Sequence, residues 1–289
     1  MKRLALGTVQ FGLPYGVANR RGQVSLDEAR AILKHAEAAG LDTLDTAVAY
    51  GNSEQRLGEI GVPQWKVVSK LSAIPEGCSD VAAWVGASVA ASLQHLQVRR
   101  LSGLLLHRPE ELLGAQGDLL YAALTRLKDD GLVQKIGVSI YDPEELNALC
   151  VKFRFDLVQA PFNLLDHRLI DSGWLARLSK QGTEVHVRSV FLQGLLLMRS
   201  ADRPEKFNRW QSLWDRWQQW LATTKLTPLQ ACLRHALAQP EIDRVIVGVD
   251  SLNQLKEILS ANEGVIPEVP AELRANDRDL INPSRWNSF

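Results

Sequence analysis

The sequence predicts an α/β protein in which eight parallel strands close into a (β/α)8 TIM barrel. Short apolar runs alternate eight times with helical patterns within 289 residues, and parallel pairing follows because each return must cross over. An open doubly wound sheet is the rival. It is disfavoured because Gly7-Thr-Val-Gln-Phe-Gly12 lacks the spacing of a dinucleotide-binding fingerprint. No linker-like stretch interrupts the chain, so residues 1–289 are expected to form one domain.

The individual elements follow from local patterns. Apolar runs predict the strands, which in chain order are Leu4–Gly12, Thr43–Ala47, Trp65–Leu71, Leu101–Leu106, Lys135–Ile140, Leu157–Phe162, Glu184–Val190 and Arg244–Val249. Helical periodicity with capping signals predicts helices at residues 25–40, 52–61, 80–96, 117–130, 143–150, 172–181, 227–239 and 251–261. Ser25 with Glu28, and Ser251 with Gln254, have the spacing of a capping box.

Two segments fall outside the alternation. Arg199–Lys225 is a helical, Trp-rich insertion after the seventh strand, in which Trp210, Trp214 and Trp217 share one helical face. We expect this stripe to pack against the barrel. The tail from Pro270 to Phe289 either folds over the barrel or is loosely held, and its Trp286 is a candidate substrate contact.

Composition excludes several classes of function. The 33 basic and 33 acidic residues balance, so no nucleic-acid-binding face is expected. Three widely spaced cysteines fit reduced thiols in the cytoplasm. The N-terminus lacks the apolar run of a signal peptide, and no stretch is apolar enough to span a membrane. No metal-ligand spacing is present. We expect a cytoplasmic monomer or weak homo-oligomer without a metal.

Four reactive side chains fall where predicted strands end. They are Asp45 and Tyr50 after the second strand, Lys70 on the third and His107 after the fourth. Barrels of this class keep their chemistry at the carboxyl ends of the strands. An ammonium beside a phenol is expected to lower the phenol pKa, and a carboxylate holds the ammonium in place. With an imidazole hydrogen-bonding a substrate oxygen, such a set suits proton transfer at a carbonyl or alcohol, with hydride from a nicotinamide. Each residue could instead be structural: a buried ion pair, a helix-entry cap or a loop anchor.

These residues resemble the aldo-keto reductase family. The resemblance rests on Asp45-Thr-Ala-Val-Ala-Tyr50-Gly-Asn-Ser-Glu54, Val-Val-Ser-Lys70 and Leu-Leu-Leu-His107, and extends over Lys-Ile-Gly-Val-Ser139, Val-Gln159-Ala-Pro-Phe-Asn163, Gln193-Gly194-Leu195 and Val-Ile-Val-Gly248. It implies an enzyme that binds NADP(H), or NAD(H), and reduces an aldehyde or ketone, or runs the reverse reaction. The opening and closing motifs look like a bacterial branch often encoded among surface-polysaccharide genes, so a sugar or sugar derivative is a possible substrate.

The resemblance also implies roles for individual residues. Tyr50 would be the general acid/base, tuned by Lys70 and Asp45, while His107 orients the carbonyl. The residues expected to bind the cofactor are Ser139, Gln159, Arg188, Ser189, Gln193, Gly194, Gly248, Ser251, Gln254 and Glu257.

Some positions depart from the family pattern. Ile140 stands where the family usually has Asn, and Arg188 where many members have an aromatic residue that stacks on the nicotinamide. Arg188 could stack on that ring, bind an anionic substrate or form a salt bridge. The helix beginning at Ser251 is a candidate anion site. Asp250 beside it would disfavour the 2′-phosphate, although the family favours NADP(H).

A second interpretation is a non-catalytic, cofactor-binding sensor or partner protein on the same scaffold, with the Trp-rich insertion as its partner surface. Burial of those tryptophans within the monomer would remove the support for this interpretation.

Overall fold

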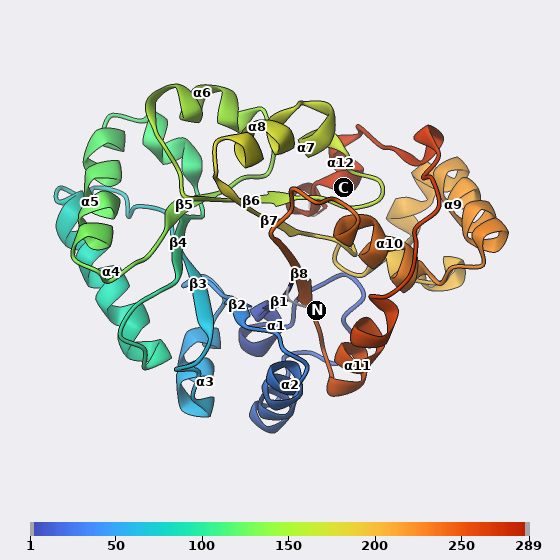
Figure 1. Ribbon diagram of the computed structural model, residues 1–289, viewed down its shortest axis with the longest axis horizontal. Coiled ribbons are helices and arrows are strands. Elements are labelled where there is room, and N and C mark those ends of the chain that lie inside the picture. Colours follow the sequence, from blue (N-terminus) through green and yellow to red (C-terminus); the bar gives the residue numbers. More distant parts are fainter. Residues whose placement is uncertain (1–2, 287–289) are drawn as a thin grey trace.

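The computed structural model describes residues 3–286, in which eight parallel strands form a closed barrel in sequence order (Figure 1). The strands are β1 (Leu4–Gly7), β2 (Thr43–Asp45), β3 (Lys66–Leu71), β4 (Gly103–Leu106), β5 (Ile136–Ser139), β6 (Leu157–Pro161), β7 (Glu184–Arg188) and β8 (Arg244–Gly248). Pairing of β1 with β8 closes the sheet, with Gly7 opposite Gly248. The predicted (β/α)8 barrel is confirmed.

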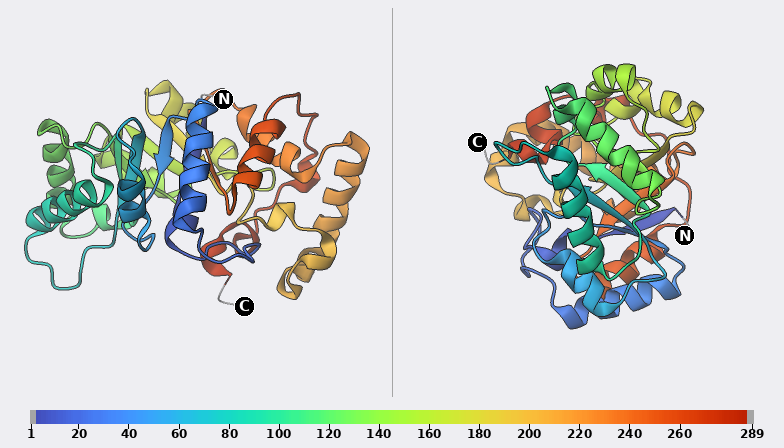
Figure 2. Two further views of the ribbon diagram at one scale, coloured as in Figure 1. Left: turned by 90° about the horizontal axis from the view of Figure 1, so that it is seen from below. Right: turned by 90° about the vertical axis from the view of Figure 1, so that its left-hand side faces the viewer.

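Helices surround the barrel (Figure 2). The α-helices are α1 (Val9–Gly12), α2 (Leu26–Ala38), α3 (Ser53–Ile60), α4 (Val81–Leu96), α5 (Gly117–Asp129), α6 (Glu145–Lys152), α7 (Arg168–Asp171), α8 (Trp174–Lys180), α9 (Gln211–Thr224), α10 (Pro228–Leu237), α11 (Leu252–Ala261) and α12 (Arg278–Ile281). Short 3-10 helices are η1 (Pro109–Leu113), η2 (Leu195–Leu197), η3 (Ser200–Asp202), η4 (Glu205–Trp210), η5 (Ala271–Leu273) and η6 (Pro283–Arg285).

Two predicted elements differ from the structure. The first strand was expected to reach Gly12, but β1 ends at Gly7 and α1 follows. Thr8 is held at this turn because both its N–H and its hydroxyl donate to the Asp45 carbonyl, at 2.9 and 3.0 Å. The helix predicted over residues 172–181 forms as the slightly shorter α8, and a short helix that was not predicted, α7, precedes it; Gly173 between the two has a φ of 76°.

Part of the barrel interior below its mouth is apolar. Val68, Leu105 and Leu157 form a buried cluster separate from the main core that lies between the strands and the helices. Side chains alternate along a strand, so Val68 shares a face of β3 with Lys70. The lysine therefore stands above an apolar plug that gives it no alternative polar partner.

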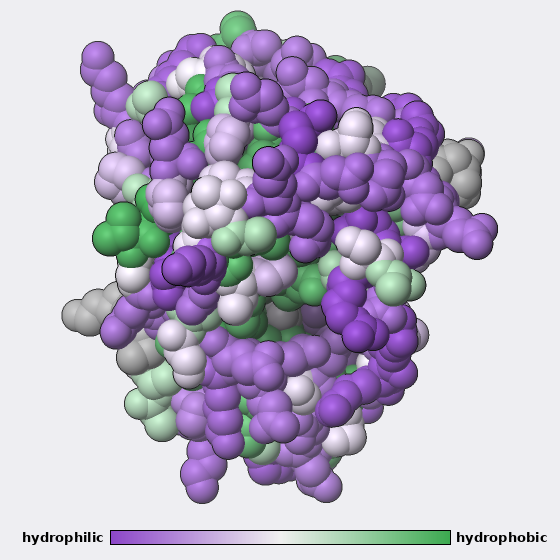
Figure 3. All heavy atoms as spheres, turned by 90° about the vertical axis from the view of Figure 1, so that its right-hand side faces the viewer, coloured by the Kyte–Doolittle hydropathy of each residue, from purple (hydrophilic) through white to green (hydrophobic). Residues whose placement is uncertain are grey.

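The Trp-rich insertion packs on the rest of the molecule. Trp214 and Trp217 are fully buried and Trp210 is partly buried against the core, so the expected packing role of the stripe is confirmed; Trp220 is 8% exposed. The Trp214 indole N–H donates to the Phe207 carbonyl at 2.8 Å. Figure 3 views the molecule from the side of the insertion, where hydrophilic residues cover most of the surface. The proposed partner surface of exposed tryptophans is therefore absent from the described residues 3–286.

The described part of the C-terminal tail is well packed. Trp286 is 4% exposed, contacts the Phe207 ring edge-on at 4.9 Å and donates its indole N–H to the Leu280 carbonyl. The Lys206 ammonium donates to the Trp286 carbonyl. This placement explains Trp286 as a packing residue and leaves little of its surface for a substrate.

Three aromatic rings pack against one another: Phe162 directly after β6, His167 directly before α7, and His235 on α10. The His235 ring centroid lies 5.2 Å from that of Phe162 and 4.8 Å from that of His167, the Phe162 and His167 centroids are 5.8 Å apart, and both imidazoles are buried. Burial, with smaller contributions from His167 and Arg274, lowers the pKa of His235 to about 3. The pKa of His167 is also lowered, chiefly by burial and then by Arg274, against the opposing charges of Asp171 and Asp166.

This group of rings predicts a loss of stability in acid. An unfolded histidine titrates near 6.5, so between that pH and about 3 the unfolded chain binds more protons than the native protein at His235. Stability contributed by neutral His235 is complete above pH 6.5 and falls by about 1.4 kcal/mol per pH unit below it. The variant His235→Phe should flatten the pH dependence of urea unfolding between pH 7 and 5. An unchanged slope in this variant would show that this group of rings does not govern acid stability.

Candidate active site

A buried ion pair lies at the mouth of the barrel, where the strands end. The Lys70 ammonium donates to both carboxylate oxygens of Asp45 at 2.8 Å and to the Thr46 carbonyl at 2.9 Å. Lys70 is 1% and Asp45 4% exposed. These three bonds use all the ammonium hydrogens, so Lys70 is fixed in position.

Two further predicted residues are tied to this pair. The Gln159 amide donates to Asp45 at 2.6 Å from β6, on the far side of the barrel. Its carbonyl oxygen accepts from the Ser139 hydroxyl at 3.3 Å. Ser139 and Gln159 thus form one buried network with Asp45.

The segment that carries Tyr50 is held by close backbone packing. A Cβ on Gly12 would lie 1.7 Å from the Tyr50 carbonyl oxygen, and one on Gly51 would lie 2.5 Å from the Gly12 carbonyl oxygen. Gly51 also has a φ of 57°, which favours glycine. Nearby, the buried Ser53 hydroxyl donates to Thr8 and accepts from Thr46. These contacts lock the start of α3 onto the ends of β1 and β2.

Tyr50 and His107 face each other across the mouth. Their rings are edge-on with centroids 6.1 Å apart, and the Lys70 ammonium lies 5.0 Å from the Tyr50 ring centroid. Burial, then the charge of Lys70, lowers the pKa of His107 to about 4. His107 is therefore neutral at pH 7 and able to donate one N–H.

The pKa of Tyr50 moves in the opposite direction to the prediction. Burial, then the Asp45 carboxylate, raises it above its usual value of 10. The expected lowering by Lys70 was wrong because that ammonium is itself neutralised and hydrogen-bonded by Asp45. Tyr50 is therefore a protonated phenol at neutral pH, able to give a proton.

Arg188 also enters this mouth, from the end of β7. Its guanidinium donates to the Ile140 carbonyl at 3.0 Å and lies over the Tyr141 ring, 4.6 Å from the centroid. A second bond goes to the Ser189 hydroxyl at 3.3 Å. Position 140 therefore contributes its backbone carbonyl to the mouth, and Ile140 has no side-chain amide like that of the Asn usual in the family. Among the ion pairs of residues 3–286 there is none to Arg188, so the predicted salt bridge is not formed there.

The segment after β7 has an unusual backbone. Ser189, Leu192 and Gln193 have φ values of 62°, 48° and 53°, and Gly194 follows at 86°. Left-handed conformations are uncommon outside glycine and gather at binding sites. The Gln193 side-chain amide donates to the Tyr15 hydroxyl at 3.0 Å. The backbone carbonyl of Gln193 accepts from the Ala18 N–H. The loop between α1 and α2 is thereby attached to this segment.

At the end of β8, Gly248 leads into α11 by way of Ser251. The Ser251 hydroxyl accepts from the Gln254 N–H, while the Gln254 side chain accepts from the Asp250 N–H. The first amide of α11, that of Leu252, donates at 2.7 Å to the Glu28 carboxylate. Glu28 therefore does not complete the capping box predicted with Ser25. The helix terminus expected to receive an anion already holds a carboxylate of this chain.

Two predicted residues are not brought into the mouth by any described contact. Glu257 is exposed on α11, where it lines a shallow surface hollow with Thr227 and Lys256. Trp286 is enclosed by the insertion and the tail. Their roles toward cofactor and substrate stay predictions.

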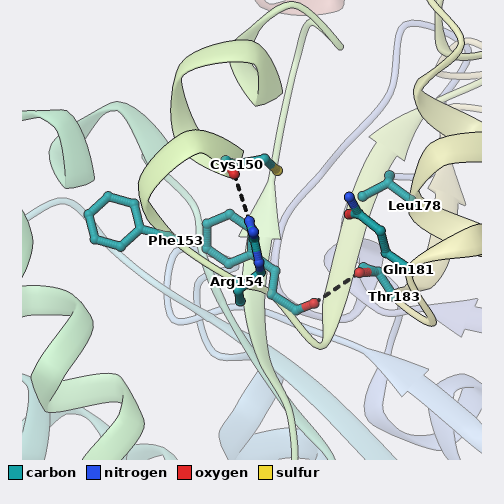
Figure 4. A pocket seen from close by; sticks show the side chains of 7 residues that line it. Cys150, Phe153, Arg154, Leu178, Gln181 and Thr183 are labelled. Carbon is teal, nitrogen blue, oxygen red and sulfur yellow. Dashed lines mark hydrogen bonds between the residues drawn. The ribbon is translucent and has the colours of Figure 1, made fainter.

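A cavity of about 320 Å³ lies elsewhere, between α6, α8 and the starts of β6 and β7 (Figure 4). Its polar groups bond among themselves: Arg154 donates to the Cys150 carbonyl and Thr183 to the Phe155 carbonyl. It sits at the amino ends of the strands, the end that supports stability in this fold. We therefore place the candidate active site at the opposite end.

Three contributors to the mouth are not evident from the sequence: Tyr15, Tyr141 and Glu28. Tyr141 comes directly after the strand end at Ser139-Ile140, a position that could have signalled it. Tyr15 and Glu28 carried no such signal, because they reach the site only through the way the loop and α2 are folded.

Two other kinds of feature are absent from the part of the chain that the structure describes. From residue 3 to residue 286, no helix combines the length and apolar character needed to cross a membrane. The same residues contain no cluster of three or more His, Cys, Asp or Glu side chains suited to a metal ion.

The closed barrel and the residues at its mouth agree with the family resemblance of the sequence. The family model for the aldo/keto reductase family matches residues 3–270, and the chain belongs to that family. An aldo-keto reductase of Mycobacterium sp. (strain KMS) is 35% identical over 128 residues, which span 43% of this chain and 44% of that protein. The oxidoreductase YqkF of Bacillus subtilis, itself uncharacterised, is 23% identical over 90% of this chain and 91% of its own.

Solved structures support the fold. The aldo-keto reductase AKR11C1 from Bacillus halodurans, in its holo form, superposes with a TM-score of 0.73 at 20% identity, over 98% of this chain and 95% of that one. The glycerol dehydrogenase AKR11B4 from Gluconobacter oxydans gives a TM-score of 0.69 at 21% identity, over 92% and 88% of the two chains.

The ion pair makes a prediction about stability. Lys70→Met should destabilise the protein by about 3–5 kcal/mol, because it leaves the Asp45 carboxylate buried without its partner. The double variant Asp45→Asn/Lys70→Met should recover much of that loss, since no charge remains. Urea unfolding monitored by tryptophan fluorescence measures both. A loss below about 1 kcal/mol in Lys70→Met would contradict the assignment of a desolvated pair.

Proposed function

We propose that this protein reduces an aldehyde or ketone to an alcohol, using a nicotinamide cofactor and a proton from Tyr50. The observation that carries the proposal is a protonated phenol, facing a neutral imidazole, beside a buried and fixed ion pair. His107 would donate an N–H to the carbonyl oxygen, and Tyr50 would protonate that oxygen as negative charge develops on it. Because burial and Asp45 disfavour the phenolate, reduction is the direction these residues suit at neutral pH.

The residues present fit a nicotinamide cofactor, which supplies hydride chemistry when it is bound. Ser139 and Gln159 offer a hydroxyl and an amide, the hydrogen-bonding complement of a carboxamide. The left-handed segment at Ser189 and Gln193 supports a binding role for the loop after β7. By family resemblance, Gly194, Gly248, Ser251, Gln254 and Glu257 would contribute to the rest of the cofactor site.

We further propose that the cofactor is NAD(H) rather than the NADP(H) that resemblance favours. Family resemblance assigns the 2′-phosphate to the start of α11. There the Glu28 carboxylate holds the Leu252 amide and Asp250 lies two residues away. Two carboxylates would repel a phosphate, and Glu28 already accepts the hydrogen bond of the Leu252 amide.

The substrate proposal is coarser. A sugar or sugar derivative follows from the resemblance to a branch encoded among surface-polysaccharide genes. The glycerol dehydrogenase among the structural neighbours acts on a polyol by its name, which is compatible with a hydroxylated substrate. The non-catalytic alternative is disfavoured, since the buried tryptophans of the insertion offer it no partner surface.

Replacement of the proposed proton donor tests the activity. Tyr50→Phe should reduce kcat for carbonyl reduction by about 10²–10⁴-fold, because a positioned acid contributes that much. Binding of NADH, followed by quenching of tryptophan fluorescence, should change little. A panel of aldehydes with NADH and NADPH provides the assay. If wild-type protein binds neither cofactor, the oxidoreductase proposal fails.

Cofactor preference is tested at the two carboxylates. The double variant Glu28→Gln/Asp250→Ser should improve the NADPH affinity relative to NADH by about tenfold or more, which corresponds to about 1.4 kcal/mol of removed repulsion. The matched control is Asp27→Asn, which removes the neighbouring acidic residue in the same turn of α2 as Glu28. Wild-type protein that prefers NADPH, or a double variant with an unchanged ratio, would contradict the NAD(H) proposal.

A further inference from the structure

Arg188 reaches across the barrel mouth. It is the last residue of β7, and its guanidinium donates to the Ile140 carbonyl at the end of β5, with β6 lying between these strands. The side chain must therefore pass over the end of β6, above the buried Gln159. This course places a cation in the space that Tyr50 and His107 face.

The guanidinium is held but not neutralised. Tyr141 covers one face of it, and the bonds to Ile140 and Ser189 use two of its five N–H donors. No carboxylate of residues 3–286 lies within ion-pair distance of it. Other rim arginines differ in this respect: Arg108, next to His107, is paired with Glu110 at 2.6 Å.

The charges of the mouth do not balance. Lys70 and Asp45 cancel each other, and His107 is neutral at pH 7, so Arg188 leaves one uncompensated positive charge. That charge acts on the reacting groups. Burial is the largest cause both of the raised pKa of Tyr50 and of the lowered pKa of His107; the charge of Arg188 opposes the shift at Tyr50 and adds to the shift at His107. A half-buried cation of this kind attracts an anion more strongly than an exposed one does.

We infer that Arg188 is the receptor for an anionic group of the substrate, a carboxylate or a phosphate carried near the carbonyl. The inference rests on the proposed carbonyl reduction and deepens it, since it defines the substrate class as anionic carbonyl compounds. A guanidinium binds either oxyanion through parallel N–H bonds, and stacking on Tyr141 fixes its plane in advance. Tyr50 and His107 would then act on the carbonyl of a substrate anchored by its charged end.

Matched substrate pairs test this inference. Glycolaldehyde is compared with glyoxylate, and glyceraldehyde with glyceraldehyde 3-phosphate, in steady-state reduction by wild type, Arg188→Gln, Arg188→Lys and the control Arg108→Gln. Wild type should favour the anionic member of at least one pair by about tenfold or more in kcat/KM. In Arg188→Gln most of that preference should be lost, a fall of about tenfold or more that acts mainly through KM, with the neutral aldehyde changed less than about threefold. Arg188→Lys should retain part of the preference, and Arg108→Gln all of it.

The outcomes distinguish a carboxylate from a phosphate as the bound group, and substrate binding from cofactor binding as the role of Arg188. A preference for glyoxylate alone identifies a carboxylate, and one for glyceraldehyde 3-phosphate alone identifies a phosphate. Equal use of the two members of both pairs by wild type overturns the inference while carbonyl reduction stands. An NADH dissociation constant raised about tenfold or more in Arg188→Gln, with an unchanged substrate preference, would assign Arg188 to the cofactor instead and also overturns it.

A direct binding measurement keeps the inference testable if no aldehyde is reduced and the proposed function fails. Calorimetric titration of the protein with oxalate and with inorganic phosphate, each in the presence of NADH, reports anion binding without turnover. Binding that is present in wild type and Arg108→Gln but lost in Arg188→Gln supports the receptor role. No binding, or equal binding by Arg188→Gln, overturns it.

Discussion

The organisation of the mouth depends on the Lys70–Asp45 ion pair. Both groups are removed from water above an apolar plug, so each needs the other to offset its desolvation. The pair draws in Thr46 and Gln159, and through Gln159 it holds Ser139. One pair thus ties together β2, β3, β5 and β6. It also sets the chemistry of the phenol, because the neutralised ammonium no longer favours phenolate.

A second constraint is steric and fixes Tyr50 relative to that pair. The contact of Gly12 with the Tyr50 backbone leaves no room for a side chain, and Gly51 turns the chain in a left-handed conformation. The hydroxyls of Thr8 and Ser53 satisfy the backbone where β1 and β2 end. The phenol therefore sits on a rigid junction of strand ends although it lies in a loop. Such preorganisation is what proton transfer to a developing charge requires.

Much of this arrangement could be predicted from the sequence. Strand ends are local features, and in a parallel barrel they must converge, so Asp45, Lys70 and His107 could be grouped from the sequence alone. The directions of side chains could not. That Gln159 bonds to Asp45, or that Glu28 leaves its own helix to hold α11, depends on how distant elements meet. The predicted direction of the Tyr50 pKa was wrong for the same reason, since that pKa depends on burial and on where the lysine hydrogens point.

Charged residues at the two ends of the proposed site act in opposite directions. At the start of α11, where the family resemblance assigns the 2′-phosphate of NADP(H), Glu28 and Asp250 add negative charge. At the mouth, Arg188 adds positive charge beside the proton donor. Repulsion at one end would discriminate NADPH from NADH, and attraction at the other would discriminate anionic from neutral carbonyl compounds. Specificity is such a difference in affinity between similar ligands. If both proposals hold, this charge distribution selects a cofactor without the extra phosphate together with a substrate that carries an anionic group.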